Sequence, residues 1–334
     1  MSRLALCCAA VFAALLPSTP GTAGWDDVVA AAKREGSVTL YTTALGAPFN
    51  KTIADDFQAK YGIQVNILDL RGSEVRERIR IEQTSGRVAG DVVQLSPSSL
   101  SEMQTENSLQ SLDNVPNEQN LRPPFERNAY SIPSQIYGFG ILVNTRLVTP
   151  ADEPKSWWDL TDPKWRGKIL SDDFRASGGG QTFFEATYDA LGVQFHEKLA
   201  QQKLVFSRDL GVSERRVAMG EYPMRIPQHL TTYLSLKGLP VKFIAPSEGL
   251  TYVQFNSARI RNAPHPNAAL LLINHYLDAK SQLTMANAGL GPVVKGVAER
   301  ADPSVTGVLT SKLLGTNHPG NQDRMLELAK QIYK

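Results

Sequence analysis

The chain has 334 residues, a formal net charge of +2 at pH 7 and 42% hydrophobic residues, which is ordinary for a globular protein. Because 35 basic residues nearly balance 33 acidic ones, the composition argues against a polyanionic partner, and we expect no nucleic-acid binding. One hydrophobic core rarely serves a chain of this length, so two lobes are expected.

The first 23 residues have the pattern of a secretory signal peptide. Arg3 precedes an apolar run from Leu4 to Leu16, Pro17 breaks the run, and small residues follow up to Ala23. The run is too short to span ~30 Å of hydrocarbon. A buried N-terminal helix is the alternative, but amphipathic spacing is missing. We therefore predict that residues 1–23 are removed and that the mature protein is periplasmic.

Both cysteines of the chain, Cys7 and Cys8, lie inside this predicted signal. The mature protein would then have no disulfide, no thiolate metal site and no cysteine nucleophile. A lipoprotein signal is not favoured, because Leu6 stands before Cys7 where a small residue is expected.

The next seventy residues alternate between helix and strand patterns. Helices are predicted at residues 25–36, 49–61 and 74–85, and strands at residues 37–41, 63–68 and 91–95. This alternation predicts a parallel sheet with helices on its faces. Ligands of such sheets bind outside the carboxyl ends of the strands, where Thr42, Thr43, Arg71 and Ser96 should lie.

Residues 109–130 contain three prolines and no clear periodicity, so an irregular segment is predicted there. Beyond it the pattern of strands and helices resumes. Strands are predicted at residues 131–143, 168–170, 222–226, 241–244 and 252–257, and helices near residues 196–202, 211–218, 229–237 and 267–279. A glycine loop, Ser177 to Gly180, precedes a further helix.

Several local patterns agree with one family. They are Gly138 to Asn144 followed by Trp157 to Ile169, Ala263 to Ala269, and Arg71-Gly72-Ser73 ahead of Asp91-Val92-Val93. On these residues the chain resembles a type-II periplasmic solute-binding protein of an ABC importer, in the branch of ferric-ion, sugar-phosphate and phosphonate binders.

The resemblance implies an α/β fold of two lobes, each a mostly parallel sheet flanked by helices, with the ligand cleft between them. Lobe 1 would comprise residues 24–130 plus 252–305, and lobe 2 residues 131–251 plus 306–334. Hinge strands would fall near residues 130–134 and 249–252, and closure would be a hinge motion.

Two groups of residues could bind an anion. Arg71 offers a bidentate fork, backed by the amides of Gly72 and Ser73 at a helix start. Ser177 to Gly180 offers amides that a ligand can approach closely. We therefore expect a small anionic solute, such as a carboxylate, phosphate ester or phosphonate.

The ferric binders of this branch carry adjacent tyrosines where this chain has His229 and Leu230. Because only Tyr233 remains nearby, a modified ferric site is kept as an alternative, and we expect neither a metal site nor a cofactor. Gln228 and His229 could instead hydrogen-bond the solute. The predicted ligand-binding residues are Thr42, Thr43, Arg71, Gly72, Ser73, Ser96, Tyr137, Ser177, Gly178, Gly179, Gln228, His229 and Tyr252.

Two other functional classes are alternatives to an importer component. An exported hydrolase is not favoured, because no Gly-x-Ser-x-Gly elbow, His-Glu-x-x-His helix or Walker loop occurs. A sensory protein that presents its ligand to a membrane receptor needs the same cleft and stays open as an alternative. The expected protein is therefore a monomeric, non-enzymatic binder that delivers its solute to an ABC permease.

Overall fold

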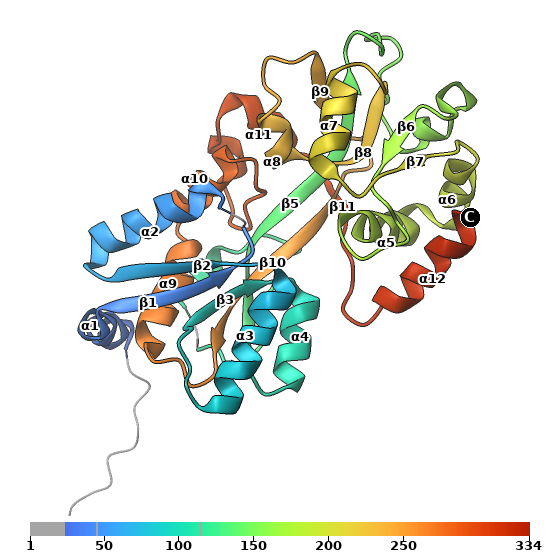
Figure 1. Ribbon diagram of the computed structural model, residues 1–334. Helices are drawn as coiled ribbons and strands as arrows, with labels where there is room; N and C mark the ends of the chain where they lie inside the picture. Colours follow the sequence, from blue (N-terminus) through green and yellow to red (C-terminus); the bar gives the residue numbers. More distant parts are fainter. Residues whose placement is uncertain (1–23, 45, 114) are drawn as a thin grey trace, which may run out of the picture.

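Alternating strands and helices build an α/β protein of two lobes, as the sequence patterns predict (Figure 1). The computed structural model describes residues 24–44, 46–113 and 115–334. The predicted signal peptide, residues 1–23, lies outside the described residues. Among the residues described, no helix combines the length and apolar character needed to cross a bilayer.

The strands and helices have the following bounds. The strands are β1 Ser37–Thr42, β2 Gln64–Asp69, β3 Val92–Leu95, β4 Leu109–Gln110, β5 Ser131–Asn144, β6 Ile169–Ser171, β7 Val205–Phe206, β8 Met224–His229, β9 Val241–Ile244, β10 Leu250–Ile260 and β11 Leu313–Gly315. The α-helices are α1 Trp25–Glu35, α2 Pro48–Tyr61, α3 Gly72–Ser85, α4 Pro97–Thr105, α5 Gly179–Leu191, α6 Val193–Ala200, α7 Leu210–Ala218, α8 Leu230–Leu234, α9 Pro266–Tyr276, α10 Ala279–Asn287, α11 Pro303–Leu309 and α12 Gln322–Ile332.

Local sequence explains where these elements begin and end, as α2 illustrates. Pro48 occupies the first helical turn, where its missing N–H costs nothing, and Gly62 ends the helix in the left-handed region at φ 73°. Phe49, Ile53 and Phe57 recur every four residues and are all buried. Similar signals end α1 at Gly36 and α3 at Gly86.

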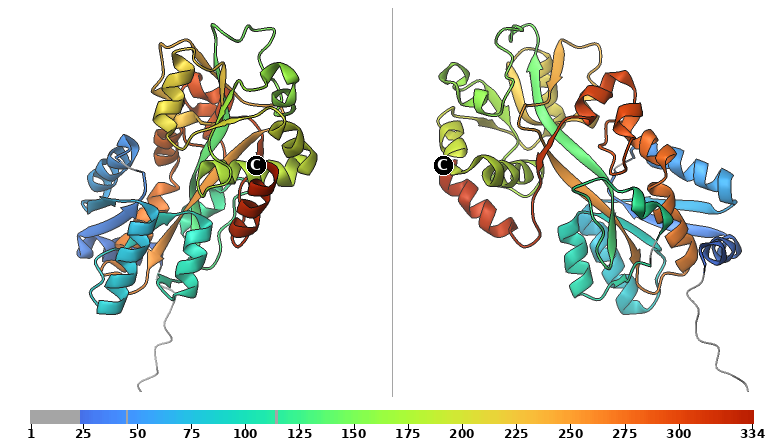
Figure 2. Two further views of the ribbon diagram at one scale, coloured as in Figure 1. Left: turned by 45° about the vertical axis from the view of Figure 1, so that its right-hand side comes forward. Right: turned by 180° about the vertical axis from the view of Figure 1, so that it is seen from behind.

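One sheet runs through both lobes in the order β2-β1-β3-β10-β5-β8-β6-β7. Its outer parts are parallel, in β2-β1-β3 and in β8-β6-β7. Its centre is antiparallel, because β10 pairs with β3 and β5, and β5 with β8. The long strands β5 and β10 lie side by side and connect the lobes in every view (Figures 1 and 2).

Each lobe has its own hydrophobic core. In the first lobe α1, α2, α9 and α10 cover one face of the sheet, and Phe57, Leu271 and Ile273 are fully buried there. In the second lobe Trp157, Phe174 and Phe183 form an aromatic cluster. Trp157 Nε1 also donates to the carbonyl of Gly249 at 2.9 Å, so this tryptophan anchors the chain just before β10.

The first-lobe core extends along β5 beyond residues 130–134, where the resemblance implies the first hinge. Ile132 and Ile136, at the start of β5, pack in the first core, whereas Ile141 and Val143 pack in the second. Ser131 to Pro133 pair with Asn256 to Ala258. The two segments predicted as hinges, residues 130–134 and 249–252, are therefore not paired with each other. The lobe bounds given above stay a prediction.

Near the C-terminus, the first-lobe core likewise extends beyond residue 305, where the resemblance implies that lobe 1 ends. Val305 and Leu309 of α11 belong to the first core, and β11 then pairs with β10. Met325 and Ala329 of α12 pack in the second core, beside α5 (Figure 2). Residues 310–321 are therefore a third connection between the lobes.

Several predicted elements differ from those observed. The strand expected at residues 91–95 leads directly into α4, for which no helix was expected, because Ser96 caps the helix and Pro97 suits its first turn. The helix expected at residues 229–237 is confined to α8, and that at residues 267–279 ends at Tyr276. Sequence patterns did not predict α10, α11, β11 or α12.

We expect Phe174→Ala to lower the free energy of unfolding by ~3–5 kcal/mol. Phe174 is fully buried, with ring centroids 5.3 Å from Phe183 and 5.0 Å from Tyr333, so truncation leaves a cavity. Urea unfolding followed by circular dichroism measures the change, and Leu147→Ala, at a side chain that is 50% exposed, is the control. Equal effects of the two substitutions would contradict the packing described.

Candidate functional site

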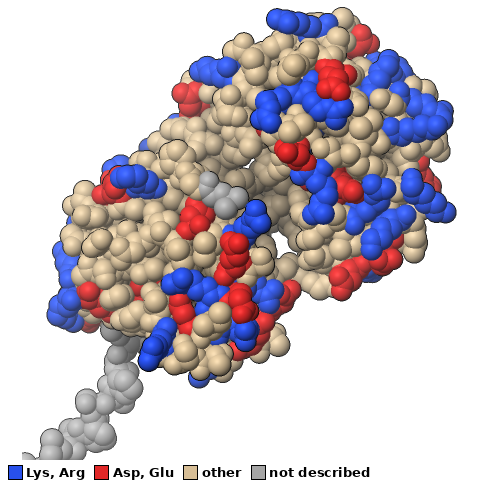
Figure 3. Space-filling view, viewed as in Figure 1, with Lys and Arg blue, Asp and Glu red and all other residues tan. Residues whose placement is uncertain are grey.

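A cleft of about 810 Å³ lies between the two lobes. Its floor is formed by β5 and β10, from which Tyr137, Phe139, Val253 and Phe255 line it. These residues alternate along antiparallel partners, so their side chains share one face of the sheet. Figure 3 shows the hollow between the lobes, with charged side chains at its rim and mostly uncharged atoms inside.

In the described part of the chain, five helices of nine residues or more begin at the walls of this cleft. α2 and α4 come from the first lobe, and α5, α7 and α12 from the second. Their first residues or caps line the space, as Ala47, Ser96, Gly178, Leu210 and Gln322 show. Helix N-termini carry unsatisfied N–H groups and partial positive charge, so the walls favour negatively charged groups.

The start of α5 contributes backbone to the second-lobe wall of the cleft, at Gly178 and Gly179. Gly178 has φ 144°, a conformation that side-chain-bearing residues rarely adopt. A Cβ at Gly180 would lie 2.8 Å from the carbonyl oxygen of Asp173, so this position also requires glycine. The amide of Gly180 donates to Asp172 Oδ2 at 2.8 Å, which fixes the loop.

Asp172 is a partly buried acid behind this wall. Burial raises the pKa of its carboxyl, and the positive charge of Arg225 and the amides of Asp173 and Gly180 counteract the rise. The carboxylate of Asp172 therefore compensates part of the partial positive charge at the N-terminus of α5.

Neutral polar side chains line both walls. They supply hydroxyl and amide groups that can donate to or accept from a solute. These residues are Thr43, Ser96, Ser98, Ser99, Ser177, Gln181, Thr182, Thr231, Thr232, Asn317 and Gln322.

Among the described residues that line the cleft, the one arginine, Arg76, is already paired. Arg76 forms ion pairs with Glu102 and with Glu106, the latter at 3.0 Å, and both acids lie on or next to α4. Its charge is therefore compensated, and recognition of a solute falls to dipoles and hydrogen bonds in the described part of the cleft.

His229 lines the cleft next to the aromatic rings of its floor. Its ring centroid is 4.5 Å from that of Phe139 and 6.3 Å from that of Tyr137. Burial, and secondarily the charge of Arg225, lowers the pKa of His229 to about 3. Burial, assisted by the charge of Asp69, raises the pKa of Tyr137 to about 12. Both side chains are thus neutral near pH 7.

The structure brings seven of the predicted ligand-binding residues to the cleft. The seven that line it are Thr43, Ser96, Tyr137, Ser177, Gly178, Gly179 and His229. Since no ligand is present, their contacts with a solute stay predictions.

The other six predicted residues do not line the cleft. Thr42 is buried, with its hydroxyl 3.5 Å from Gln94 Oε1. Gln228 is fully buried in a hydrogen-bond network, and Tyr252 packs against Phe125 in the first core. Successive side chains of a strand point to opposite faces of the sheet. Because Val253 faces the cleft, its neighbour Tyr252 points into the core.

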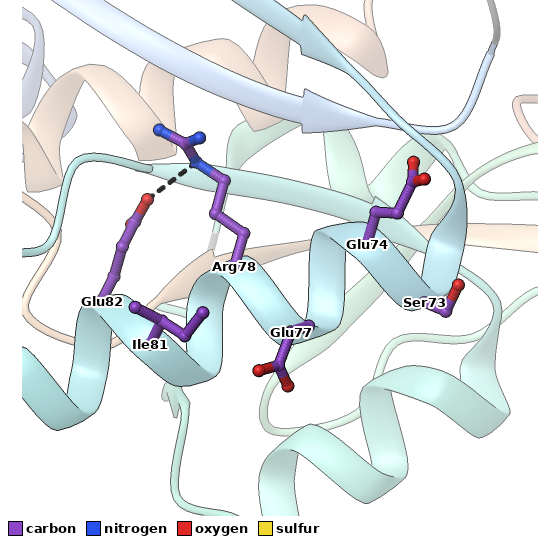
Figure 4. Close-up of a pocket in the computed structure, with 6 residues that line it drawn as sticks. All are labelled: Ser73, Glu74, Glu77, Arg78, Ile81 and Glu82. Atoms are coloured by element: carbon purple, nitrogen blue, oxygen red, sulfur yellow. Dashed lines mark hydrogen bonds and ion pairs between the residues drawn. The ribbon is translucent and has the colours of Figure 1, made fainter.

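Arg71, Gly72 and Ser73 are the remaining three, and they start α3 outside the cleft lining. Arg71 is exposed at the N-cap, where its amide donates to Glu74 Oε2 at 2.9 Å. Ser73 borders a surface hollow along α3 that also includes Glu77 and Ile81 (Figure 4). The geometry therefore gives no support to the ligand contact predicted for Arg71.

Sequence reasoning missed Phe139, Phe255, Arg76, Asn317 and Gln322. The strand period of two could have identified the two phenylalanines, because Phe139 lies two residues after Tyr137 on β5 and Phe255 lies two residues after Val253 on β10. The last two follow β11, in a part of the chain without a strong pattern. No group of three or more His, Cys, Asp or Glu residues that could hold a metal ion occurs within residues 24–44, 46–113 and 115–334.

Comparisons with known proteins agree with this geometry. Residues 52–307 match the family described as bacterial extracellular solute-binding protein. Iron-bound HitA from Pseudomonas aeruginosa is similar in structure at TM-score 0.66 and 22% identity, covering 89% of this chain and 98% of that one.

Two further solved structures are also similar over 89% of this chain. A protein described as a GABA receptor has TM-score 0.71 and 21% identity, with 98% of its chain covered. The substrate-binding protein of an ABC transporter from Agrobacterium tumefaciens has TM-score 0.71 and 14% identity, with 94% covered. At these identities the likeness shows the fold alone.

We expect His229 to stay neutral in the folded protein between about pH 5 and 8, because its pKa is lowered to about 3. NMR of the imidazole nitrogens during a pH titration measures this, with urea-unfolded protein, in which histidine titrates near ~6.5, as control. Between these two pKa values the unfolded state binds more protons, so the free energy of unfolding should fall as the pH decreases from ~6.5. A folded-state inflection at ~6.5 would contradict the lowered pKa of His229.

Proposed function

Because the chain belongs to the family of bacterial extracellular solute-binding proteins, we propose that it captures a small organic anion in the interlobe cleft for an ABC importer. The solute would be a carboxylate, phosphate ester or phosphonate. Residues 1–23 would direct the protein to the periplasm, where it would work as a monomer and deliver the solute to an ABC permease.

The convergence of helix N-termini from both lobes carries this proposal. An anion between α4 and α5 can accept hydrogen bonds from first-turn amides and from hydroxyls such as Ser99 and Thr182. Such sites bind anions without a paired arginine, so the exposed position of Arg71 does not weigh against an anionic solute.

The floor of the cleft supports an organic body on the solute. Tyr137 and Phe255 are partly exposed to the space, with ring centroids 5.3 Å apart, and Leu290 borders it from the first lobe. Apolar and aromatic surface beside hydrogen-bond donors is the usual composition of a small-molecule site. A bare inorganic ion would leave this surface unused.

The placement of the lining supports closure on the solute. Hydroxyl groups of the first lobe lie at Thr43, just before α2, and on α4, whereas the polar side chains of the second lobe lie on α5, α8 and α12 and at Asn317. A solute that contacts both walls binds the closed arrangement better than the open one, so it shifts the population toward closure. β5, β10 and the segment 310–321 are the connections that would bend.

A ligand screen by native mass spectrometry and thermal shift tests the proposal. We expect one or more organic anions, among carboxylates, phosphate esters and phosphonates, to raise the melting temperature, because binding to the folded state stabilises it by mass action. A shift with Fe(III) alone would favour a ferric-binding protein. No shift with any anion would refute the proposed solute class.

Gly179→Ala tests the α5 wall. The new methyl would lie 3.4 Å from Asp172 Oδ2 and 3.6 Å from both His229 Nε2 and the Phe139 ring, which are ordinary van der Waals contacts, but it narrows the approach of a solute to the amides. We expect the affinity for the best anion of the screen to fall about tenfold in calorimetry. Gly307→Ala, with open space around its Cβ, is the matched control, and equal affinities of the two variants would contradict a solute contact at Gly179.

Arg71→Ala separates the sequence-based prediction from the structural one. A direct charge-assisted contact would be worth ~1.5–3 kcal/mol. Because Arg71 is exposed and lies outside the lining, we expect the affinity for the same anion to change by less than about twofold. A loss larger than tenfold would restore the role that the sequence assigned to Arg71.

A further inference from the structure

Arg225 is a fully buried arginine behind the second-lobe wall of the cleft. It lies on β8 between Leu142 of β5 and Leu170 of β6. Its Nη1 donates to the carbonyl of Pro227 at 2.5 Å and to Gln228 Oε1 at 3.0 Å. Its Nε and Nη2 atoms have no hydrogen-bond partner among the described residues. A buried guanidinium is costly unless nearby negative charge compensates it.

Two acids from different elements supply that charge. Glu214 on α7 is joined to Arg225 through Gln228, which accepts from Arg225 Nη1 and donates to Glu214. Asp172 follows β6, and its amide donates to the carbonyl of Ile226, the residue next to Arg225, at 2.9 Å. The negative charge of each acid attracts the Arg225 guanidinium. The third titratable group that faces Arg225 is His229, which is neutral near pH 7. Neither acid forms a direct ion pair with Arg225 within 4.0 Å in the part of the chain described, so the attraction acts through space.

Each of these acids fixes one part of the cleft wall. Asp172 accepts from the amides of Gly180 at 2.8 Å and Asp173 at 2.9 Å, which fixes the start of α5. Glu214 accepts from Gln228 Nε2 at 2.8 Å and from the Thr232 hydroxyl. Since Gln228 also donates to Thr232 at 2.9 Å, the network reaches the cleft at Thr232.

We propose that Arg225 is a positioning residue of the solute site, whose buried charge compensates Asp172 and Glu214 and thereby fixes the α5 start and Thr232. It touches no solute itself, since it does not line the cleft. The expected effect of Arg225 on anion affinity rests on the proposed function. Its effect on the Gly180 amide, which acts through Asp172, does not.

Removal of the charge has a specific consequence. In Arg225→Met, Asp172 would be buried without its compensating cation, so its carboxyl would take up a proton at a higher pH. Protonation weakens the acceptor for the Gly180 amide. At higher pH the ionised carboxylate beside the α5 N-terminus would instead repel an anionic solute.

NMR of the Gly180 amide in the mature protein tests the proposal without any solute. We expect the inflection that reports Asp172 to move up by at least about one pH unit in Arg225→Met. Arg225→Lys, which keeps the charge, should restore most of the wild-type profile, and Arg225→Met combined with Asp172→Asn should show no inflection. An unchanged Gly180 profile in Arg225→Met would overturn the proposal.

Should Arg225→Met fail to fold, Asp172→Asn alone provides the second measurement. We expect amide hydrogen exchange to accelerate at Gly180 and its helix neighbours, and to stay unchanged in α9 of the other lobe. Equal exchange in the variant and the wild type would contradict the hold of Asp172 on α5.

Binding of benzoate and of sulfate, which stay ionised between about pH 6 and 8, adds the functional readout. Where wild type binds either anion, Arg225→Met should lose affinity progressively as the pH rises, and the double variant should not. Failure of wild type to bind any anion in the earlier screen, with the Gly180 profiles as expected, would refute the proposed solute class and leave the positioning role intact.

Discussion

The antiparallel pairing of β5 with β10 is the interaction on which the rest of the structure depends. The two strands pair from Thr251↔Phe139 to Ala258↔Ser131, and through them the parallel strands of each lobe join one sheet. Their shared face supplies the floor of the cleft at Tyr137 and Phe255. The same strand pairing that joins the lobes therefore also forms the floor of the cleft.

Parallel β-α units place helix N-termini toward this floor. Where a strand ends and a helix begins, the chain turns at the edge of the sheet, and in each lobe that edge faces the cleft. α4 after β3 and α5 after β6 are the examples that lie on opposite walls. Backbone donors are thereby gathered without a cluster of basic side chains, which accords with a net charge of only +2.

A second layer of interactions lies behind the donors. Arg225, Asp172 and Glu214 come from β8, the loop after β6 and α7, three elements separated in sequence. A donor can select a solute only when its position is fixed, because a mobile amide loses entropy when it binds. Buried polar groups behind the wall are a physical means of fixing it.

Local sequence patterns are sufficient to predict the fold class, the order of most strands and helices, and the family of the chain. Those features depend on local signals, such as the four-residue spacing from Phe49 to Phe57 and the glycine after each early helix. Seven of the predicted residues lie at the cleft because strand ends and glycine loops are local features too. Tertiary structure decided the rest. Packing between distant segments, which no local pattern encodes, places Arg71 outside the cleft lining and turns Val253 instead of Tyr252 toward the cleft. It also buries Gln228, whose Oε1 accepts from Arg225.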